Sequence, residues 1–284
     1  MSAVLTIMGY GFREAVRRKV FTVVVLLTAA FLFLFWLATR YVFSRLSSIQ
    51  PGDINVDPRT FAGAFLLGLS MFATLFLGVV LAVFLTLGVV SGDAERGLLQ
   101  PLVVRPIGRA TLLLSRFLGA AVVCIVYVLA VYGIALAIID VSGSWVPPSP
   151  LAPGLELAGG VVIAIALSIL GSVFLSSTAN GIAIFMLFGA GLTAGLLGSI
   201  GHALRSPAIE HASRDVAWAL PFEALYQDGL GIISSNASGT TGFLLQLGPF
   251  GGAFVHGWGI RVWSVGYLCV ALALAVFLFG RRDL

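Results

Sequence analysis

Long apolar runs alternate with short polar segments along most of this chain. Six of the runs reach about 20 residues or more, the length that an α-helix needs to cross a hydrocarbon core of roughly 30 Å. Because almost no charged side chain interrupts them, each run is predicted to form one membrane-spanning helix. The six predicted spans are Val20–Phe43, Phe61–Val90, Leu112–Ile139, Leu155–Leu175, Gly181–Ile200 and Trp258–Gly280.

The composition agrees with this pattern. Of the 284 residues, 59% are hydrophobic and only 10% are charged, whereas about a quarter of the residues in a soluble globular domain are charged. A mean hydropathy of +1.07 likewise excludes a water-soluble globule. No soluble domain, low-complexity tail or long-period repeat interrupts the runs. The sequence therefore predicts an all-α, polytopic membrane protein that forms one domain over residues 1–284.

The first 19 residues carry a helical pattern of their own. Apolar side chains recur at steps of three and four residues, while arginines gather on another face and Glu14 is placed to pair with Arg18. This pattern predicts an amphipathic helix in the membrane interface. The alternative is a frayed basic N-terminus that only sets the topology. The apolar positions are Leu5, Met8, Phe12 and Val16.

Basic residues near span ends favour the cytoplasmic side. With six spans, both termini lie on one side, and placing them in the cytoplasm puts ten basic residues inside and six outside. Since four acidic residues fall inside and eight outside, the net charge of +4 divides into +6 and −2. This division suits contact with anionic inner-leaflet lipids, and nucleic acid is not predicted as a partner.

The longest polar stretch, Ser91–Arg116, lies between the second and third predicted spans and reads SGDAERGLLQPLVVRPIGRATLLLSR. A hydroxyl or acidic side chain at its start can cap a short helix over Glu95–Leu99, and two prolines limit its extension. The alternative is a loop whose charges are solvated and follow the distribution of basic residues described above.

This stretch resembles the cytoplasmic signature of ABC-2-type permeases, the membrane subunits of bacterial ATP-binding-cassette exporters. The basic N-terminus, the six spans and the large outer loop before the last span also resemble that family, and most of all its compact subfamily that includes the permease of the nitrous-oxide-reductase maturation system. The residues that carry the resemblance are Asp93 or Glu95, Gly97, Leu98, Leu99, Pro106, Arg109 and Arg116.

The resemblance implies that residues 91–110 form a coupling segment, with a coupling helix that docks on a separate nucleotide-binding ATPase. The chain contains no phosphate-binding G-x-x-x-x-G-K-[ST] loop, and its only lysine is Lys19. It is therefore predicted to be no enzyme and to hold no cofactor, while ATP and Mg²⁺ bind to the partner. The predicted docking residues are Asp93, Glu95, Arg96, Gly97, Leu98, Leu99, Arg105 and Arg109.

The resemblance also implies a homodimer of permeases with two ATPases, in which the first and fifth spans line the subunit boundary and the translocation route. Phe31 and Phe35, one turn apart, would lie on this route; the alternative is that they pack against lipid or neighbouring helices. Gly191, Gly195 and Ser199 form a stripe of small residues that permits close helix approach. Packing within one subunit explains this stripe as well as packing across a dimer.

The expected function is export of a hydrophobic or amphipathic substrate across the bacterial inner membrane. A gradient-driven carrier or channel is the first alternative, but such proteins place ionisable groups near the bilayer midplane. None of the six runs has a charge near its middle; the charges Arg40, Asp140, Glu156 and Arg261 lie near span ends, where they can contact water. A membrane scaffold without transport is the second alternative.

The outer loop, residues 201–257, is too long for a simple turn. A helix is predicted after Ser206, with Pro207 at its first position. The following ALPFEALYQDGL is apolar enough to enter the interface, so one or two lid-like helices are expected over the outer mouth. No metal site is assigned, because the histidines lack ligand spacing, although one is conceivable. The candidate ligands are His202, Glu210, His211 and His256.

Overall fold

The computed structural model describes residues 19–46, 58–87, 108–234 and 257–281. Within these ranges the chain forms eight α-helices and no strand, which confirms the predicted all-α class. Six of these helices are long and apolar enough to cross a membrane, as predicted. The long helices are α2 (Lys19–Leu46), α3 (Pro58–Thr86), α5 (Arg109–Gly143), α6 (Ala152–Ser172), α7 (Ser177–Ala203) and α11 (Gly257–Arg281); the short ones are α8 (Pro207–Ala219) and α9 (Pro221–Ser234).

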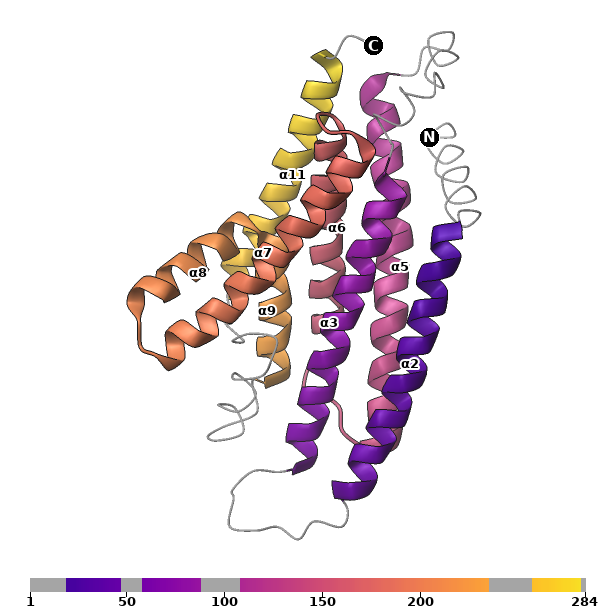
Figure 1. Cartoon of the computed structure of the whole chain (residues 1–284), viewed down its shortest axis with the longest axis vertical. Coiled ribbons are helices and arrows are strands. Elements are labelled where there is room, and N and C mark those ends of the chain that lie inside the picture. The colour runs from indigo at the N-terminus through magenta and orange to yellow at the C-terminus, as the bar shows by residue number, and fades with distance from the viewer. Residues whose placement is uncertain (1–18, 47–57, 88–107, 235–256, 282–284) are drawn as a thin grey trace.

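Helix α6 is the centre of the bundle. It contacts α3, α5, α7, α9 and α11, while α2 packs on the outer side of α3 and α5. Figure 1 shows α2, α3 and α5 side by side, with α7 crossing the bundle obliquely and α11 on the far side from α2. Hydrophobic side chains one turn apart on α6 are completely buried, as expected for a helix enclosed by others. These side chains are Leu157, Val161, Ile165 and Ile169.

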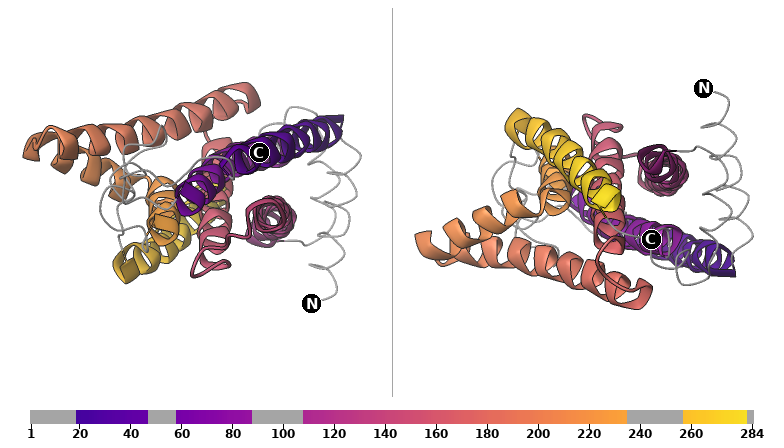
Figure 2. Two further views of the ribbon diagram at one scale, coloured as in Figure 1. Left: turned by 90° about the horizontal axis from the view of Figure 1, so that it is seen from below. Right: turned by 90° about the horizontal axis from the view of Figure 1, so that it is seen from above.

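Three helices finish and three others start toward one end of the bundle (Figure 1). The helices that finish there are α3, α6 and α11, and those that start there are α2, α5 and α7. Figure 2 gives the views along the bundle from both ends, in which α7 and α8 project away from the other helices. The last residues of α3 and the first residues of α5 therefore lie toward the end of the bundle where α11 also finishes. This arrangement is the one expected if the coupling segment and the C-terminus share a side; the cytoplasmic orientation stays a prediction.

Helix α6 begins well inside the bundle. Helix α5 ends with Ser144 in the left-handed region at φ 50°, where its N–H donates to Asp140 O at 2.8 Å. The chain then turns back along α5, and the Tyr132 hydroxyl donates to Pro150 O at 2.8 Å. Because Tyr132 precedes the end of α5 by 11 residues, α6 starts roughly 17 Å inward from that end at about 1.5 Å per residue.

The short helices follow the sequence prediction in one case and depart from it in the other. After α7, Arg205 takes a left-handed conformation and the Ser206 N–H donates to Gly201 O at 2.9 Å. This turn reverses the chain, and α8 begins at Pro207 as predicted.

Helix α9, which the sequence placed in a lid, instead packs against α3, α6, α7, α8 and α11. Adjacent glycines of α6 let α9 approach closely, because a Cβ at Gly160 would lie 3.1 Å from Phe222 O and one at Gly159 would lie 3.3 Å from Leu225 Cδ1. Bulkier residues at these positions would hold the two helices apart. The lid expectation was wrong for this helix, because its apolar side chains pack against other helices inside the bundle.

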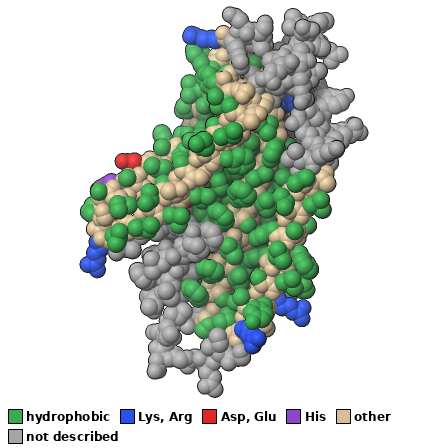
Figure 3. Space-filling view, in the orientation of Figure 1, with side chains coloured by type: hydrophobic (Ala, Val, Ile, Leu, Met, Phe, Trp, Pro, Cys, Tyr) green, Lys and Arg blue, Asp and Glu red, His purple; other side chains and the backbone are tan. Residues whose placement is uncertain are grey.

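The outward surface is mainly apolar, as expected for helices that face lipid. In Figure 3, hydrophobic side chains cover the visible face, and the arginine and lysine side chains that it shows lie toward the ends of the helices and near the turn between α7 and α8. Several arginines lie over aromatic rings near helix ends. The guanidinium carbons of Arg40, Arg261 and Arg281 are 5.8, 5.9 and 4.3 Å from the ring centres of Trp36, Trp258 and Phe277.

Candidate functional site

The predicted coupling segment lies almost wholly outside the described residues. This applies to Asp93, Glu95, Arg96, Gly97, Leu98, Leu99 and Arg105. The structure describes the helix ends that flank the segment: α3 ends at Thr86, and α5 begins at Arg109, of which only the backbone is described. The interfacial helix predicted for residues 1–19 also falls outside the described residues, apart from Lys19. Docking on an ATPase therefore stays a prediction.

The predicted aromatic pair of the translocation route lies on the inner face of α2. The ring centres of Phe31 and Phe35 are 5.7 Å apart in a stacked arrangement, and Phe35 is only 4% exposed. Nearby, the hydroxyls of Thr28 and Tyr127 form a hydrogen bond of 2.5 Å between α2 and α5. The buried Phe35 ring and the hydrogen bond between Thr28 and Tyr127 hold α2 against the bundle within one chain. A role of the two phenylalanines in a route stays a prediction.

The predicted stripe of small residues on α7 faces α9 of the same chain. A Cβ at Gly191 would lie 3.1 Å from the Phe222 ring, and one at Gly195 would lie 2.6 Å from both Glu223 Oε1 and Gln227 Nε2. The Ser199 side chain is not described. The within-subunit alternative therefore accounts for both glycines, and contact with a second copy stays a prediction. The stripe and the phenylalanines belong to different helix contacts, because α2 packs on α3 and α5.

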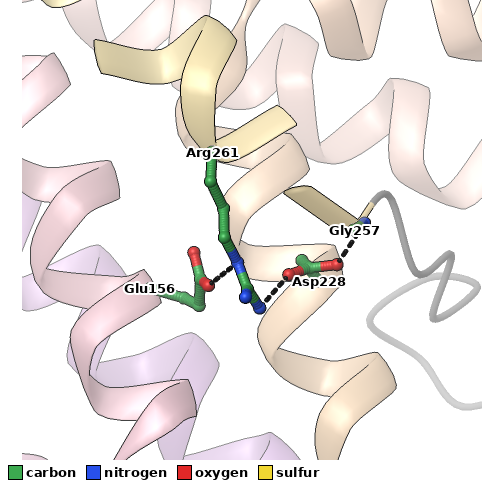
Figure 4. A network of polar contacts seen from close by, with 4 residues as sticks. All are labelled: Glu156, Asp228, Gly257 and Arg261. Carbon is green, nitrogen blue, oxygen red and sulfur yellow. Dashed lines mark hydrogen bonds and ion pairs between the residues drawn. The ribbon is translucent and has the colours of Figure 1, made fainter. Parts of the chain in front are cut away.

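A buried ionic network joins three helices that the sequence analysis did not connect. Arg261 of α11 lies between two carboxylates: its Nε is 2.7 Å from Glu156 Oε1 of α6, and its terminal nitrogen Nη2 donates to Asp228 Oδ2 of α9 at 2.8 Å (Figure 4). Asp228 is completely buried and Glu156 is 9% exposed, whereas the arginine side chain is 35% exposed. The arginine thus retains contact with the surroundings while both acids are enclosed.

The start of α11 adds a further contact to this network. The backbone N–H of Gly257 donates to Asp228 Oδ1 at 3.1 Å (Figure 4). Two carboxylates and one guanidinium leave a formal charge of −1, which the partial positive charge of a helix N-terminus stabilises. Asp228 of α9 therefore binds two residues at the start of α11, Gly257 and Arg261.

The network lies level with the middle of α3. A Cβ at Gly229, next to Asp228, would be 2.9 Å from Met71 Cε and 3.6 Å from Glu156 Cβ. Met71 is midway along the 29 residues of α3, so about 20 Å of that helix extends in each direction. Glu156 and Arg261 do lie near the ends of their own helices, as predicted. They are nevertheless inside the bundle, because α6 begins inward from the end of α5 and α11 packs against α6 and α9.

A second polar group lies nearer the start of α9. Glu223 is 2% exposed, and its Oε1 accepts a hydrogen bond of 2.8 Å from the Gln227 side-chain amide. Burial raises the pKa of the Glu223 carboxyl to about 7, against a smaller opposing effect of the Gln227 hydrogen bond. Burial also raises the pKa of the neighbouring Tyr226 hydroxyl well above its usual value. Both effects arise because an ionised group loses its hydration inside the protein.

Sequence reasoning missed these residues because it assigned residues 201–257 to the outside. The available signal was local: the segment from Pro221 to Ser234 carries two acids in a short apolar run, with Glu223 and Gln227 one turn apart. Acids in such a run indicate either a water-exposed face or a paired interior position. Only the packing of α9 against five other helices distinguishes these two possibilities.

The arrangement is suited to holding helices together rather than to catalysis. Among the described residues, no group of three His, Cys, Asp or Glu side chains is placed to hold a metal ion. The His202 side chain and all of His256 lie outside the described set. The network instead joins α6, α9 and α11, whose relative positions it fixes through charge-assisted contacts.

Comparison with known proteins supports the resemblance drawn from the polar stretch. The family model for ABC-2 family transporter proteins matches residues 5–284, nearly the whole chain. No curated protein matches this sequence. The family match and the six apolar helices indicate a multi-pass membrane protein and a transporter subunit rather than an enzyme. The chain therefore belongs to the ABC-2 family of transporter proteins, as the membrane subunit of an ABC transporter, a type of protein that associates with an ATP-binding subunit.

Proposed function

We propose that two copies of this chain and two ATP-binding subunits form an exporter in the bacterial inner membrane. Its substrate is hydrophobic or amphipathic, both termini of each copy are cytoplasmic, and ATP and Mg²⁺ bind to the partner subunits. The observation that carries this proposal is the family match over residues 5–284. Within the family, the segment Ser91–Arg116 and the basic N-terminus favour the compact subfamily that includes the nitrous-oxide-reductase maturation permease.

The packing of α3 and α5 supports a coupling role for the segment between them. A Cβ at Gly78 of α3 would lie 2.9 Å from Val161 of α6 and 3.1 Å from Val128 of α5, so the three helices touch without intervening space. Closely packed elements transmit displacement because they cannot be compressed. A movement of the ATP-binding subunits at residues 91–110 would therefore shift α3 and α5 together and reach α6, which contacts α9 and α11.

Two substitutions in the coupling segment test the proposal. We expect Glu95→Arg and Gly97→Pro each to lower ATP-driven transport and co-purification of the ATP-binding subunit by roughly tenfold or more, since central interface residues typically contribute about 2 kcal/mol. The measurement is uptake into inverted vesicles with ATP, together with quantification of the bound ATPase. Asp215→Arg, a charge reversal at an exposed position on α8, is the control. Unchanged assembly and transport in both coupling variants would contradict the docking assignment.

A gradient-driven carrier is the second candidate, because the structure buries carboxyl groups of Glu156, Glu223 and Asp228 among apolar helices. Buried ionisable groups in membrane proteins commonly mark ion pathways. The decisive measurement is transport by the purified chain in liposomes with an imposed proton gradient and no ATP-binding subunit. We expect no transport under these conditions; substrate movement would replace the exporter proposal with the carrier.

A further inference from the structure

The Glu223 side chain has an unusual environment at the start of α9. Its Oε1 accepts a hydrogen bond from Gln227, but within the described part of the chain its other oxygen, Oε2, has no hydrogen-bond partner although it is buried. The adjacent Tyr226 hydroxyl is also buried and unpartnered among the described residues. An ionised carboxylate in this position would lack the hydrogen bonds that normally compensate for lost hydration.

The surrounding helices provide little room for a hydrated ion. On the α7 side, a Cβ at Gly195 would be 2.6 Å from Glu223 Oε1, and a Cβ at Gly191 would be 3.3 Å from Glu223 Cβ. A metal cation in a protein requires several oxygen ligands around it. A proton needs only the unpartnered oxygen, and the resulting O–H group becomes a hydrogen-bond donor.

No described cation neutralises Glu223. The guanidinium of Arg261, on α11, is held by Glu156 of α6 and by Asp228 of α9 itself. Where α3 and α7 pack near α9, they present Gly68, Met71, Leu75, Gly191 and Gly195, which do not titrate. The other ionisable side chains described on the helices that pack against α9 lie on three helices: Arg59 at the far start of α3; Tyr267, Cys269 and Arg281 on α11; and Glu210, His211, Arg214 and Asp215 on α8.

We propose that the Glu223 carboxyl is a proton-binding site, and that the bound proton keeps α9 packed against α7. The proton resides on the carboxyl group, so no counter-ion is required inside the bundle. When the proton leaves, the carboxylate is buried without a compensating charge, and the packed position of α9 loses stability relative to one in which water reaches Glu223.

The direction of the pH dependence follows from the two states. The pKa of Glu223 is about 7 when α9 is packed, compared with its usual 4.5. The proton therefore stabilises the packed state fully below pH 4.5. This stabilisation is lost as the pH rises from 4.5 through about 7, and it changes no further above that. A rise of this size corresponds to roughly a few hundredfold in the packing equilibrium. In the proposed exporter, alkaline pH would thus loosen α9; this consequence rests on the proposed function, whereas proton binding does not.

The test is hydrogen exchange of the full chain in lipid nanodiscs at pH 5.5, 6.5, 7.5 and 8.5, corrected for the intrinsic pH dependence of exchange. In the wild type, we expect protection of the α9 amides to fall by roughly tenfold to a hundredfold over this range, while α3 protection stays constant. Glu223→Gln, a neutral side chain of similar shape, should keep α9 protected at every pH. Asp215→Asn, which removes an exposed carboxyl on α8, should behave like the wild type.

Two results would overturn the proposal: wild-type α9 protection that is independent of pH, or a Glu223→Gln profile that still follows the wild type. Should Glu223→Gln fail to fold, the wild-type exchange profile still tests the proposal. Infrared spectroscopy of the wild type tests it as well, because we expect the band of a protonated carboxyl to disappear between pH 6 and 8. None of these readouts requires the ATP-binding subunit. A result that contradicts the exporter proposal would therefore leave the proton-binding proposal intact. A result that contradicts proton binding at Glu223 would likewise leave the exporter proposal intact.

Discussion

Replacing Arg261 with leucine is expected to cause the largest loss of stability of any single substitution in the described part of the chain. The change leaves Glu156 and Asp228 buried without their shared counter-charge. Removing one partner of a buried ion pair typically costs about 3–5 kcal/mol, and the 35% exposure of the arginine side chain points to the lower end of that range. We expect the thermal unfolding midpoint in detergent to fall by roughly 5–10 °C.

Two comparisons separate the loss of the charge pair from a general effect of removing an arginine. Arg214→Leu, on the exposed side of α8, should leave the midpoint unchanged within about 1 °C. Neutralising both acids in the same molecule, by combining Arg261→Leu with Glu156→Gln and Asp228→Asn, should recover much of the loss because no charge then remains buried. If the triple variant were less stable than Arg261→Leu, unpaired carboxylates would not be the cause of the instability.

The second large effect is expected at the contact between α7 and α9. In Gly195→Leu, the new side chain would collide with Glu223 Oε1 and Gln227 Nε2, each only 2.6 Å from the position of its Cβ. Overpacking of this kind costs about 1–3 kcal/mol, and here α9 must also move away. We expect hydrogen exchange in α9 to accelerate by at least about tenfold and ATP-driven transport to fall in parallel.

Gly189→Leu is a matched control on the same helix, because a Cβ at Gly189 meets nothing within 4 Å. It should leave both α9 exchange and transport unchanged. The Gly195→Leu variant also distinguishes the two explanations of the small-residue stripe. If the stripe chiefly served contact with a second copy, the substitution would dissociate the dimer, seen by mass measurement in nanodiscs, and leave α9 exchange as in the wild type.

The parts of the fold that hydropathy and turn chemistry determine could be predicted from the sequence. All six apolar runs became long helices, since nearly every side chain in them favours a nonaqueous environment. The start of α8 at Pro207 followed from proline at a first helical position. The family resemblance was likewise carried by a contiguous polar stretch, and the family match confirms it at the level of the ABC-2 family.

The position of α9 could not be predicted in this way. Its 14 residues are too few to cross a bilayer, so a search for spans passes over it. Contacts with distant residues place it inside the bundle. Gly160 of α6 lies against its backbone, Gly159 lies against the Leu225 side chain, and Arg261 of α11 pairs with Asp228. None of these contacts leaves a periodic signal, because the partners lie on separate helices. For the same reason the sequence did not show that Glu156 and Arg261, although near the ends of their own helices, are enclosed by other helices.

The arginines that lie over aromatic rings at the two ends of α11 also indicate how deep the ionic network lies in the bilayer. Arg261 and Arg281 are 20 residues apart, or about 30 Å along the helix axis, which equals the hydrocarbon thickness of an average membrane. Because α3 extends about 20 Å to either side of the level of the network, a bilayer centred on the longer helices would place Arg261 in the hydrocarbon region, and its partly exposed guanidinium would need water that enters along α11. The two acids that it binds are enclosed further than the arginine itself, and Asp228 is completely buried.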